Sequence, residues 1–186
     1  MMRILGVDPG TRVVGYGCLE LEEDRRCRAS AADLPLAHRV HNMGRAAGGR
    51  VQVVGSGVLR LGRTDPIQDR LWRLSEGIRS LLDQWRPAEL ALEEAFAGKS
   101  VQSALRLGEA RGVILAEARR AGVTVNQYPP ASIKRSVTGS GAAGKEQVAY
   151  MVVHSLGLKA APDTSDESDA LAVGLCCAAA KGSFLP

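Results

Sequence analysis

Aromatic residues are scarce in this chain, and it has neither a long apolar run nor a CxxC motif. Because no run has membrane-spanning length and the N-terminus lacks the apolar stretch and cleavage site of a signal peptide, we expect a cytoplasmic protein with no membrane contact. The four cysteines include an adjacent pair, Cys176 and Cys177, inside an apolar helical run. This pattern disfavours a disulfide framework or a zinc knuckle and predicts reduced, mostly buried thiols.

Apolar residues and arginine, in contrast, are plentiful. Hydrophobic residues make up 45% of the 186 residues, which predicts a single domain spanning the whole chain, with a short flexible C-terminal tail. The net charge is +4 and the sequence pI is near 9.1, an excess that comes mostly from arginine. Positive charge of this kind favours a nucleic-acid partner, although an acidic protein partner stays an alternative.

Strand-like runs alternate with amphipathic helices along the chain. Strands are expected at residues 3–8, 13–21, 51–61, 89–96 and 123–128, and helices at about 65–86, 100–121, 132–137, 145–158 and 166–180. This order predicts an α/β fold, a mixed five-stranded sheet with helices on both faces. In such a sheet the first strand usually lies centrally, beside the fourth.

Residues 22–50, between the second and third strands, are rich in arginine, alanine and glycine and have no clean periodicity. Long structureless connections are uncommon in compact domains. We therefore interpret this segment as an inserted basic arm, which either follows a DNA arm through phosphate contacts or is a disordered insertion. His38 and His41, with Cys27 upstream, are a poor ligand set for zinc.

Carboxylates are expected to converge from three elements. Asp8 ends the first strand, Glu93 and Glu94 lie side by side in the fourth, and Asp166 and Asp169 share one face of the last helix. Converging carboxylates repel unless a cation neutralises them, and oxygen ligands select Mg²⁺ or Mn²⁺. Two such ions are the usual means of hydrolysing a phosphodiester.

Each acid also has a purely structural interpretation. Asp8 precedes Pro-Gly and fits a turn residue, and Asp166 fits a first-turn acid favoured by the helix dipole. Thr164 and Glu167 match a capping box. For any one of these sites, the structural interpretation is about as good as the functional one. That all three sites are purely structural at once is a much weaker interpretation. Because side chains alternate along a strand, the two adjacent glutamates point to opposite faces of the sheet. This alternation does not say which of them shares the face of Asp8.

Four blocks of the sequence resemble the RuvC family, bacterial Holliday junction resolvases with an RNase H-like fold. They are GVDPGTRVVGYG, LALEEAFAGKSVQSALRLGEARG, KRSVTGSGAAGKEQV and DESDALAVGL, and the resemblance covers nearly the whole chain except residues 22–50. It implies a Mg²⁺-dependent homodimeric endonuclease that makes symmetric paired nicks in four-way DNA junctions during recombination and repair. It also implies two ions per site, held by Asp8, Glu93, Asp166 and Asp169, with Mn²⁺ as a substitute.

The resemblance also assigns residues to the DNA. Lys145 supports the scissile phosphate, and Phe96 stacks on unpaired bases at the crossover. Further DNA contacts are expected at Lys99, at Lys134 through its family position, and at Gly139, Gly141 and Gly144, because a glycine-rich backbone leading into a helix binds phosphate oxygens well. From sequence alone, Phe96 also fits a core residue, and Lys134 and Lys145 fit solvated surface charges. Residues 139–146, GSGAAGKE, satisfy half of a Walker A motif, but Glu146 stands where Ser or Thr would bind Mg²⁺ and a helix is expected where a P-loop needs a strand.

The helix at 100–121 carries small residues four apart, Ala104, Gly108 and Gly112. The resemblance places it at a dimer interface, while packing against its own sheet would use the same residues. The resemblance further implies contact with a branch-migration motor of RuvA and RuvB proteins. Rival interpretations are an RNase H-like nuclease of RNA, a non-cleaving junction-binding protein, and an ATP-hydrolysing Hsp70, actin or sugar-kinase relative, for which the chain is too short.

Overall fold

The computed structural model describes residues 1–22, 50–94 and 100–182. The predictions for the basic arm, for Cys27, His38 and His41, for Phe96 and Lys99 and for the last residues of the C-terminal tail lie outside this part of the chain.

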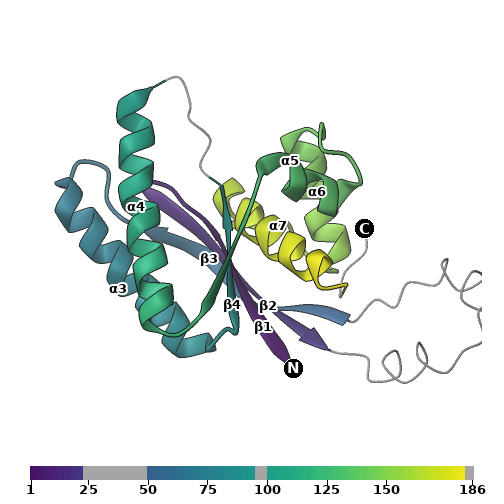
Figure 1. Cartoon of the computed structure of the whole chain (residues 1–186). Coiled ribbons are helices and arrows are strands. Elements are labelled where there is room, and N and C mark those ends of the chain that lie inside the picture. The colour runs from purple at the N-terminus through teal and green to yellow at the C-terminus, as the bar shows by residue number, and fades with distance from the viewer. Residues whose placement is uncertain (23–49, 95–99, 183–186) are drawn as a thin grey trace, which may run out of the picture.

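A five-stranded mixed sheet forms the centre of the molecule, in the order β3-β2-β1-β4-β5 (Figure 1). The strands are β1 (Met2–Asp8), β2 (Val13–Glu22), β3 (Arg50–Arg60), β4 (Glu89–Glu93) and β5 (Thr124–Tyr128). β1 pairs with β2 in antiparallel and with β4 in parallel, and β4 pairs in parallel with β5. The predicted fold class and the central place of the first strand beside the fourth are confirmed.

Helices cover both faces of the sheet, as predicted. They are α3 (Ile67–Trp85), α4 (Val101–Arg120), α5 (Pro130–Thr138), α6 (Lys145–Ser155) and α7 (Ser165–Ala180). Figure 1 shows α3 and α4 on one side and α5, α6 and α7 on the other. No helix within the described ranges combines the length and the apolar character that a bilayer crossing requires.

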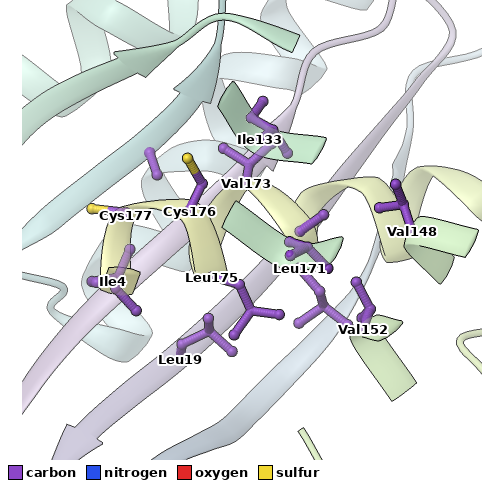
Figure 2. Close-up of a cluster of buried hydrophobic side chains, with 14 of the residues drawn as sticks. Ile4, Leu19, Ile133, Val148, Val152, Leu171, Val173, Leu175, Cys176 and Cys177 are labelled. Atoms are coloured by element: carbon purple, nitrogen blue, oxygen red, sulfur yellow. The ribbon is translucent and has the colours of Figure 1, made fainter. Parts of the chain in front are cut away.

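Each face of the sheet has its own apolar core. On the α7 side, Leu171 and Leu175 pack with Ile4 and Leu19 (Figure 2). On the other side, Leu5, Val7, Leu90 and Leu92 of the sheet pack with α3 and α4. The cysteines Cys18, Cys176 and Cys177 are buried free thiols, which confirms the prediction for these three.

Two predicted elements end earlier than the apolar pattern suggested. The fourth strand ends at Glu93 instead of residue 96, and α6 ends at Ser155 instead of residue 158. In the second case Gly157 has a left-handed φ of 59°, while Leu156 and Leu158 still pack against the core. The apolar spacing therefore continues past the helix because these half-buried leucines pack against the core from an irregular segment.

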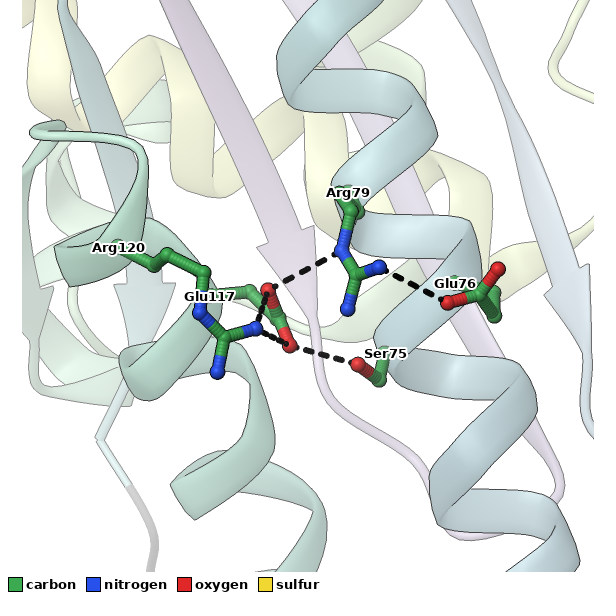
Figure 3. A network of polar contacts seen from close by, with 5 residues as sticks. All are labelled: Ser75, Glu76, Arg79, Glu117 and Arg120. Atoms are coloured by element: carbon green, nitrogen blue, oxygen red, sulfur yellow. Dashed lines mark hydrogen bonds and ion pairs between the residues drawn. The ribbon is translucent and has the colours of Figure 1, made fainter.

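A buried polar network joins α3 to α4 (Figure 3). The Glu117 side chain, only 6% exposed, accepts a hydrogen bond from the Ser75 hydroxyl at 2.6 Å and pairs with Arg120 at 2.8 Å and with Arg79 at 3.6 Å. The hydrogen bond from Ser75, helped by the two arginines, lowers the pKa of Glu117 below its ordinary value of 4.5. The network ties the C-terminal part of α4 to α3.

Replacing this glutamate should weaken the fold in a pH-dependent way. A carboxyl group whose pKa is lower in the folded state stabilises the protein above its unfolded pKa, and this contribution is lost as the pH falls through the folded value. Glu117→Gln should therefore cost about 1 kcal/mol of unfolding free energy at pH 7, and less below about pH 4. Urea unfolding at both pH values measures it. Glu76→Gln, which removes an exposed acid paired with Arg79, is the matched control and should change little.

The last helix approaches the sheet unusually closely at glycines. A Cβ on Gly6 would lie 2.2 Å from the backbone oxygen of Ala170 and 2.8 Å from the backbone nitrogen of Gly174. A Cβ on Gly15 would lie 1.8 Å from the backbone oxygen of Asp166. Side chains at these strand positions would push α7 away, so Gly6 lets the middle of the helix lie against β1 and Gly15 lets its first turn lie against the start of β2.

Gly6→Ala should consequently destabilise the protein by about 3 kcal/mol or more, since two backbone segments must separate. Its antiparallel partner in the register, Gly17, offers a matched comparison. A Cβ there would meet the Cδ2 atom of Leu171, the end of a side chain that can turn aside. Thermal unfolding of the two variants should show the larger loss for Gly6→Ala. Equal losses would mean that the backbone approach is not what limits the packing.

Candidate functional site

Asp8 and Glu93 lie at neighbouring ends of the two central strands. The parallel register pairs Val7 with Leu92, so the next step along both strands brings these two carboxylates side by side. Alternation also fixes their face: Ala91 packs in the core on the α7 side, and Glu93 shares that face. Glu94 follows with the opposite parity and is exposed. The register thus resolves what parity alone left open: Glu93, and not Glu94, shares the face of Asp8.

The acids near the start of α7 have two roles: Glu167 stabilises the start of the helix, and Asp166 and Asp169 face the other acids. Thr164 caps the helix by accepting a hydrogen bond from the Glu167 backbone N–H at 3.2 Å. The Glu167 carboxylate accepts hydrogen bonds from the Ser56 hydroxyl at 2.6 Å and from the Asp163 backbone N–H at 3.1 Å. Glu167 therefore ties the helix start to β3. Asp166 and Asp169 are left facing the sheet ends, where both raise the pKa of Asp8.

Lys145, the first residue of α6, enters the site from the other side. Its ammonium group lies 2.7 Å from a carboxylate oxygen of Asp169. A pocket of about 210 Å³ adjoins these groups; its lining residues include Glu93, Lys134, Lys145 and Asp169. Lys134 and Lys145, two of the three lysines assigned to the DNA, are thus beside the acids. The left-handed Gly139 ends α5, and the loop that carries Gly141 and Gly144 leads directly into α6.

Burial and mutual repulsion act strongly on the acids. Burial, with Asp169, Glu93 and Asp166 as further causes, raises the pKa of Asp8 from 3.8 to about 7, against the smaller opposing effect of Lys145. Burial and Asp169 also raise the pKa of Glu93. These effects mean that the four carboxylates interact electrostatically at one place. Such a cluster is stable in its ionised form only with added positive charge.

The carboxylate oxygens of the four acids are the type of ligand that a hard divalent cation prefers. Within the described ranges, no three His, Cys, Asp or Glu side chains are grouped closely enough to hold one ion, and Asp169 is turned to Lys145. The four acids nevertheless offer only oxygen ligands, on the ends of two strands and one helix turn that the glycine contacts hold together. Carboxylate oxygens of this kind suit Mg²⁺ and Mn²⁺ rather than the softer transition metals.

Sequence analysis missed a buried arginine that supports Glu93. Arg111 of α4 is 9% exposed, and its guanidinium donates hydrogen bonds to the Glu93 backbone oxygen and to the Gln127 side chain. It fixes the end of β4 against β5 and α4. The available signal was its spacing, because Arg111 lies three residues before Ile114 and seven before Ala118 on the buried face of α4.

The structure excludes the Walker A interpretation. Residues 139–144 follow the helix α5, whereas a P-loop follows a strand.

The small-residue ridge of α4 faces solvent in the described part of the chain. A Cβ built on Gly108 or Gly112 meets nothing within 4 Å. Val101 and Leu105, on the same face, are 78% and 65% exposed. Packing against the protein's own sheet, the alternative that sequence left open, is therefore excluded for Gly108 and Gly112, while Ala104 is half-buried. We call the surface formed by Val101, Leu105, Gly108 and Gly112 the α4 ridge.

Comparison with known proteins gives one consistent result. The family model "Crossover junction endodeoxyribonuclease RuvC" matches residues 38–177. A curated relative of that name from Anaeromyxobacter sp. (strain K) is 41% identical, covering 100% of this chain and 85% of the relative. Another from Halorhodospira halophila is 39% identical, covering 95% and 89%. Asp8 precedes the range of the family model, but the first of these relatives spans it.

Solved structures agree with the sequence relatives. Thermus thermophilus RuvC in complex with a Holliday junction substrate superposes with a TM-score of 0.79 at 30% identity, covering 100% of this chain and 99% of that one. The yeast mitochondrial Holliday junction resolvase Ydc2 superposes with a TM-score of 0.56 at 14% identity, over 94% of this chain and 78% of that one, which shows a shared fold.

Proposed function

The chain belongs to the RuvC family of crossover junction endodeoxyribonucleases, and on this basis we propose that it resolves four-way DNA junctions by symmetric paired nicks in recombination and repair. Enzymes of this family are nucleases that hydrolyse phosphodiester bonds. The observation that carries the proposal is the convergence of Asp8, Glu93, Asp166 and Asp169 from three elements beside two lysines.

The four acids are proposed to hold the metal ions of a metal-dependent nuclease. We propose two ions of Mg²⁺, with Mn²⁺ as a substitute. When bound, they would supply an activated water and stabilise the charge that develops on the leaving oxygen. The protein's own contribution is to keep Asp8 and Glu93 side by side on rigid strand ends and to bring the α7 acids onto them through the glycine contacts.

The lysines are proposed to hold the DNA. Lys145 would leave Asp169 for the scissile phosphate once metal neutralises the carboxylate, and Lys134 would contact the neighbouring backbone. The loop glycines Gly139, Gly141 and Gly144 allow a phosphate to approach the start of α6 closely. Stacking by Phe96 and DNA contact by Lys99 remain proposals on residues outside the described part of the chain.

Symmetric cutting needs two active sites, and we propose a two-fold dimer through the α4 ridge. The exposure of Val101 and Leu105 and the open space above Gly108 and Gly112 support this surface. Contact with a branch-migration motor of RuvA and RuvB proteins is proposed from family membership. A DNA substrate also favours the cytoplasm as the place of action.

A panel of substrates tests the proposed function. Purified protein is incubated with Mg²⁺ and a labelled four-way junction, a matched linear duplex, or an RNA–DNA hybrid of the same sequence. The proposal expects cleavage confined to the junction. Preferred cleavage of the hybrid would assign an RNA substrate to the same fold, and junction binding without cleavage in Mg²⁺ or Mn²⁺ would assign a non-catalytic role.

A further inference from the structure

A second pocket lies beside the catalytic acids, on the side away from the lysines. It has a volume of about 730 Å³ and is lined by Gly10, Thr11, Arg12, Val13, Arg70, Gln102, Ser103, Arg106 and Asp166. These residues come from the β1–β2 turn and the starts of α3, α4 and α7. Among the described residues, the lining carries three arginines, one acid and three uncharged polar side chains, Thr11, Gln102 and Ser103.

The arginines have hydrogen-bonding capacity to spare. Arg70 donates one bond, to the Thr11 backbone oxygen at 2.8 Å, while its buried Nε atom has no partner among the described residues. No hydrogen bond or ion pair of the Arg12 side chain is found in that part of the chain either. Arg106 pairs with Glu109 at 3.0 Å. Because this ion pair is exposed, Arg106 can exchange it for another anion at little cost in free energy. None of the three forms an ion pair with Asp166.

The position of this pocket suits a continuous DNA strand. Asp166 belongs to its lining, whereas Glu93 and Asp169 line the lysine pocket, so the two pockets flank one set of carboxylates. A strand whose scissile phosphate lies at the acids would then pass the lysines on one side and the arginines on the other. Planar guanidinium groups bind phosphate oxygens in pairs, so three arginines in one pocket favour a phosphate over a base.

We propose that this arginine pocket binds a backbone phosphate of the cleaved strand, next to the scissile phosphate. The inference rests on the proposed function, since it takes the acids as the cleavage point. The pocket anchors the strand independently of base sequence and acts on DNA binding, while the chemistry stays with the carboxylates.

Arg12→Gln is the most informative variant, because the Arg12 side chain supports no described contact in the fold. We expect its junction dissociation constant to rise about 5- to 20-fold near 0.1 M salt, and the slope of log affinity against log salt to fall by about one per subunit. Single-turnover cleavage with saturating enzyme should stay within about threefold of the unmodified rate. Arg70→Lys keeps the positive charge but loses the planar guanidinium that can donate two hydrogen bonds to one phosphate. It should therefore weaken binding less than Arg70→Gln.

Arg86→Gln is the control, as it removes the same charge from an exposed position before the start of β4, at the opposite end of that strand from Glu93. Unchanged affinity and salt slope in Arg12→Gln and Arg70→Gln, with cleavage by the unmodified enzyme intact, would overturn the phosphate subsite alone. A cleavage rate that falls at saturation with binding unchanged would overturn it too, since the arginines would then act on Asp166. Failure of the unmodified enzyme to cleave the junction would instead overturn the proposed function.

Discussion

Asp8→Asn should lower junction cleavage by about three orders of magnitude or more while leaving junction binding within a few fold. Asparagine keeps the shape of the side chain but removes one of the negative charges that the metal ions require. Asp8 lies at the centre of the cluster, where three other acids raise its pKa. Single-turnover cleavage in Mg²⁺ and a binding titration in EDTA measure the two quantities.

The same substitution should stabilise the metal-free protein. In EDTA near pH 8 the buried Asp8 carboxylate faces Asp169, Glu93 and Asp166, and the amide removes that repulsion. We expect a rise of about 1–3 kcal/mol in unfolding free energy, because functional sites commonly hold charges at the expense of stability. Asp83→Asn, at an exposed position of α3, is the matched control and should change neither property. Normal cleavage by Asp8→Asn would remove this residue from the catalytic site.

For the proposed two-fold dimer, Gly108→Glu should leave the enzyme monomeric and uncouple the two nicks. A Cβ at this position has no atom of the described residues within 4 Å, and glutamate is a better helix former than glycine, so the fold should persist. Two glutamates facing each other across a two-fold ridge would repel and be desolvated. Light scattering should show one protomer, and product analysis should show singly nicked junctions in place of resolved duplexes.

A glutamate on the neighbouring helix serves as the control for charge. Ser80→Glu adds the same charge to an exposed position of α3, off the α4 ridge, and should leave the dimer and the paired nicks intact. A dimeric Gly108→Glu enzyme that still resolves junctions would place the dimer interface elsewhere.

Local patterns were enough to predict the elements and their order. The strands and helices follow from apolar period and from turn residues, which are properties of short segments. The acids could be named because Asp8 ends the first strand, two glutamates lie in the fourth strand and two aspartates share one face of the last helix, and the family resemblance selected Glu93. The expected strand order was enough to predict that these acids meet at one edge of the sheet. The raised pKa of Asp8, to which the other three acids contribute, agrees with this prediction.

Contacts between distant segments could not be predicted from such patterns. The choice of Glu93 over Glu94 depends on the pairing of Val7 with Leu92, which is a matter of strand register. The role of Arg111 depends on its hydrogen bonds to Glu93 of β4 and Gln127 of β5, which are distant in the sequence. The arginine pocket is likewise invisible along the chain, because four separate elements contribute to its walls.

The most direct test of the account follows the positions of cleavage on a four-way junction. Each of the four strands is labelled in turn, and the junction is incubated with the enzyme in Mg²⁺ or in EDTA, with Asp8→Asn in parallel. The account predicts nicks at symmetric positions in two opposed strands, lost in EDTA and in the variant while binding persists. Cleavage that continues in EDTA or in Asp8→Asn, or that falls on linear duplex as readily as on the junction, would contradict it.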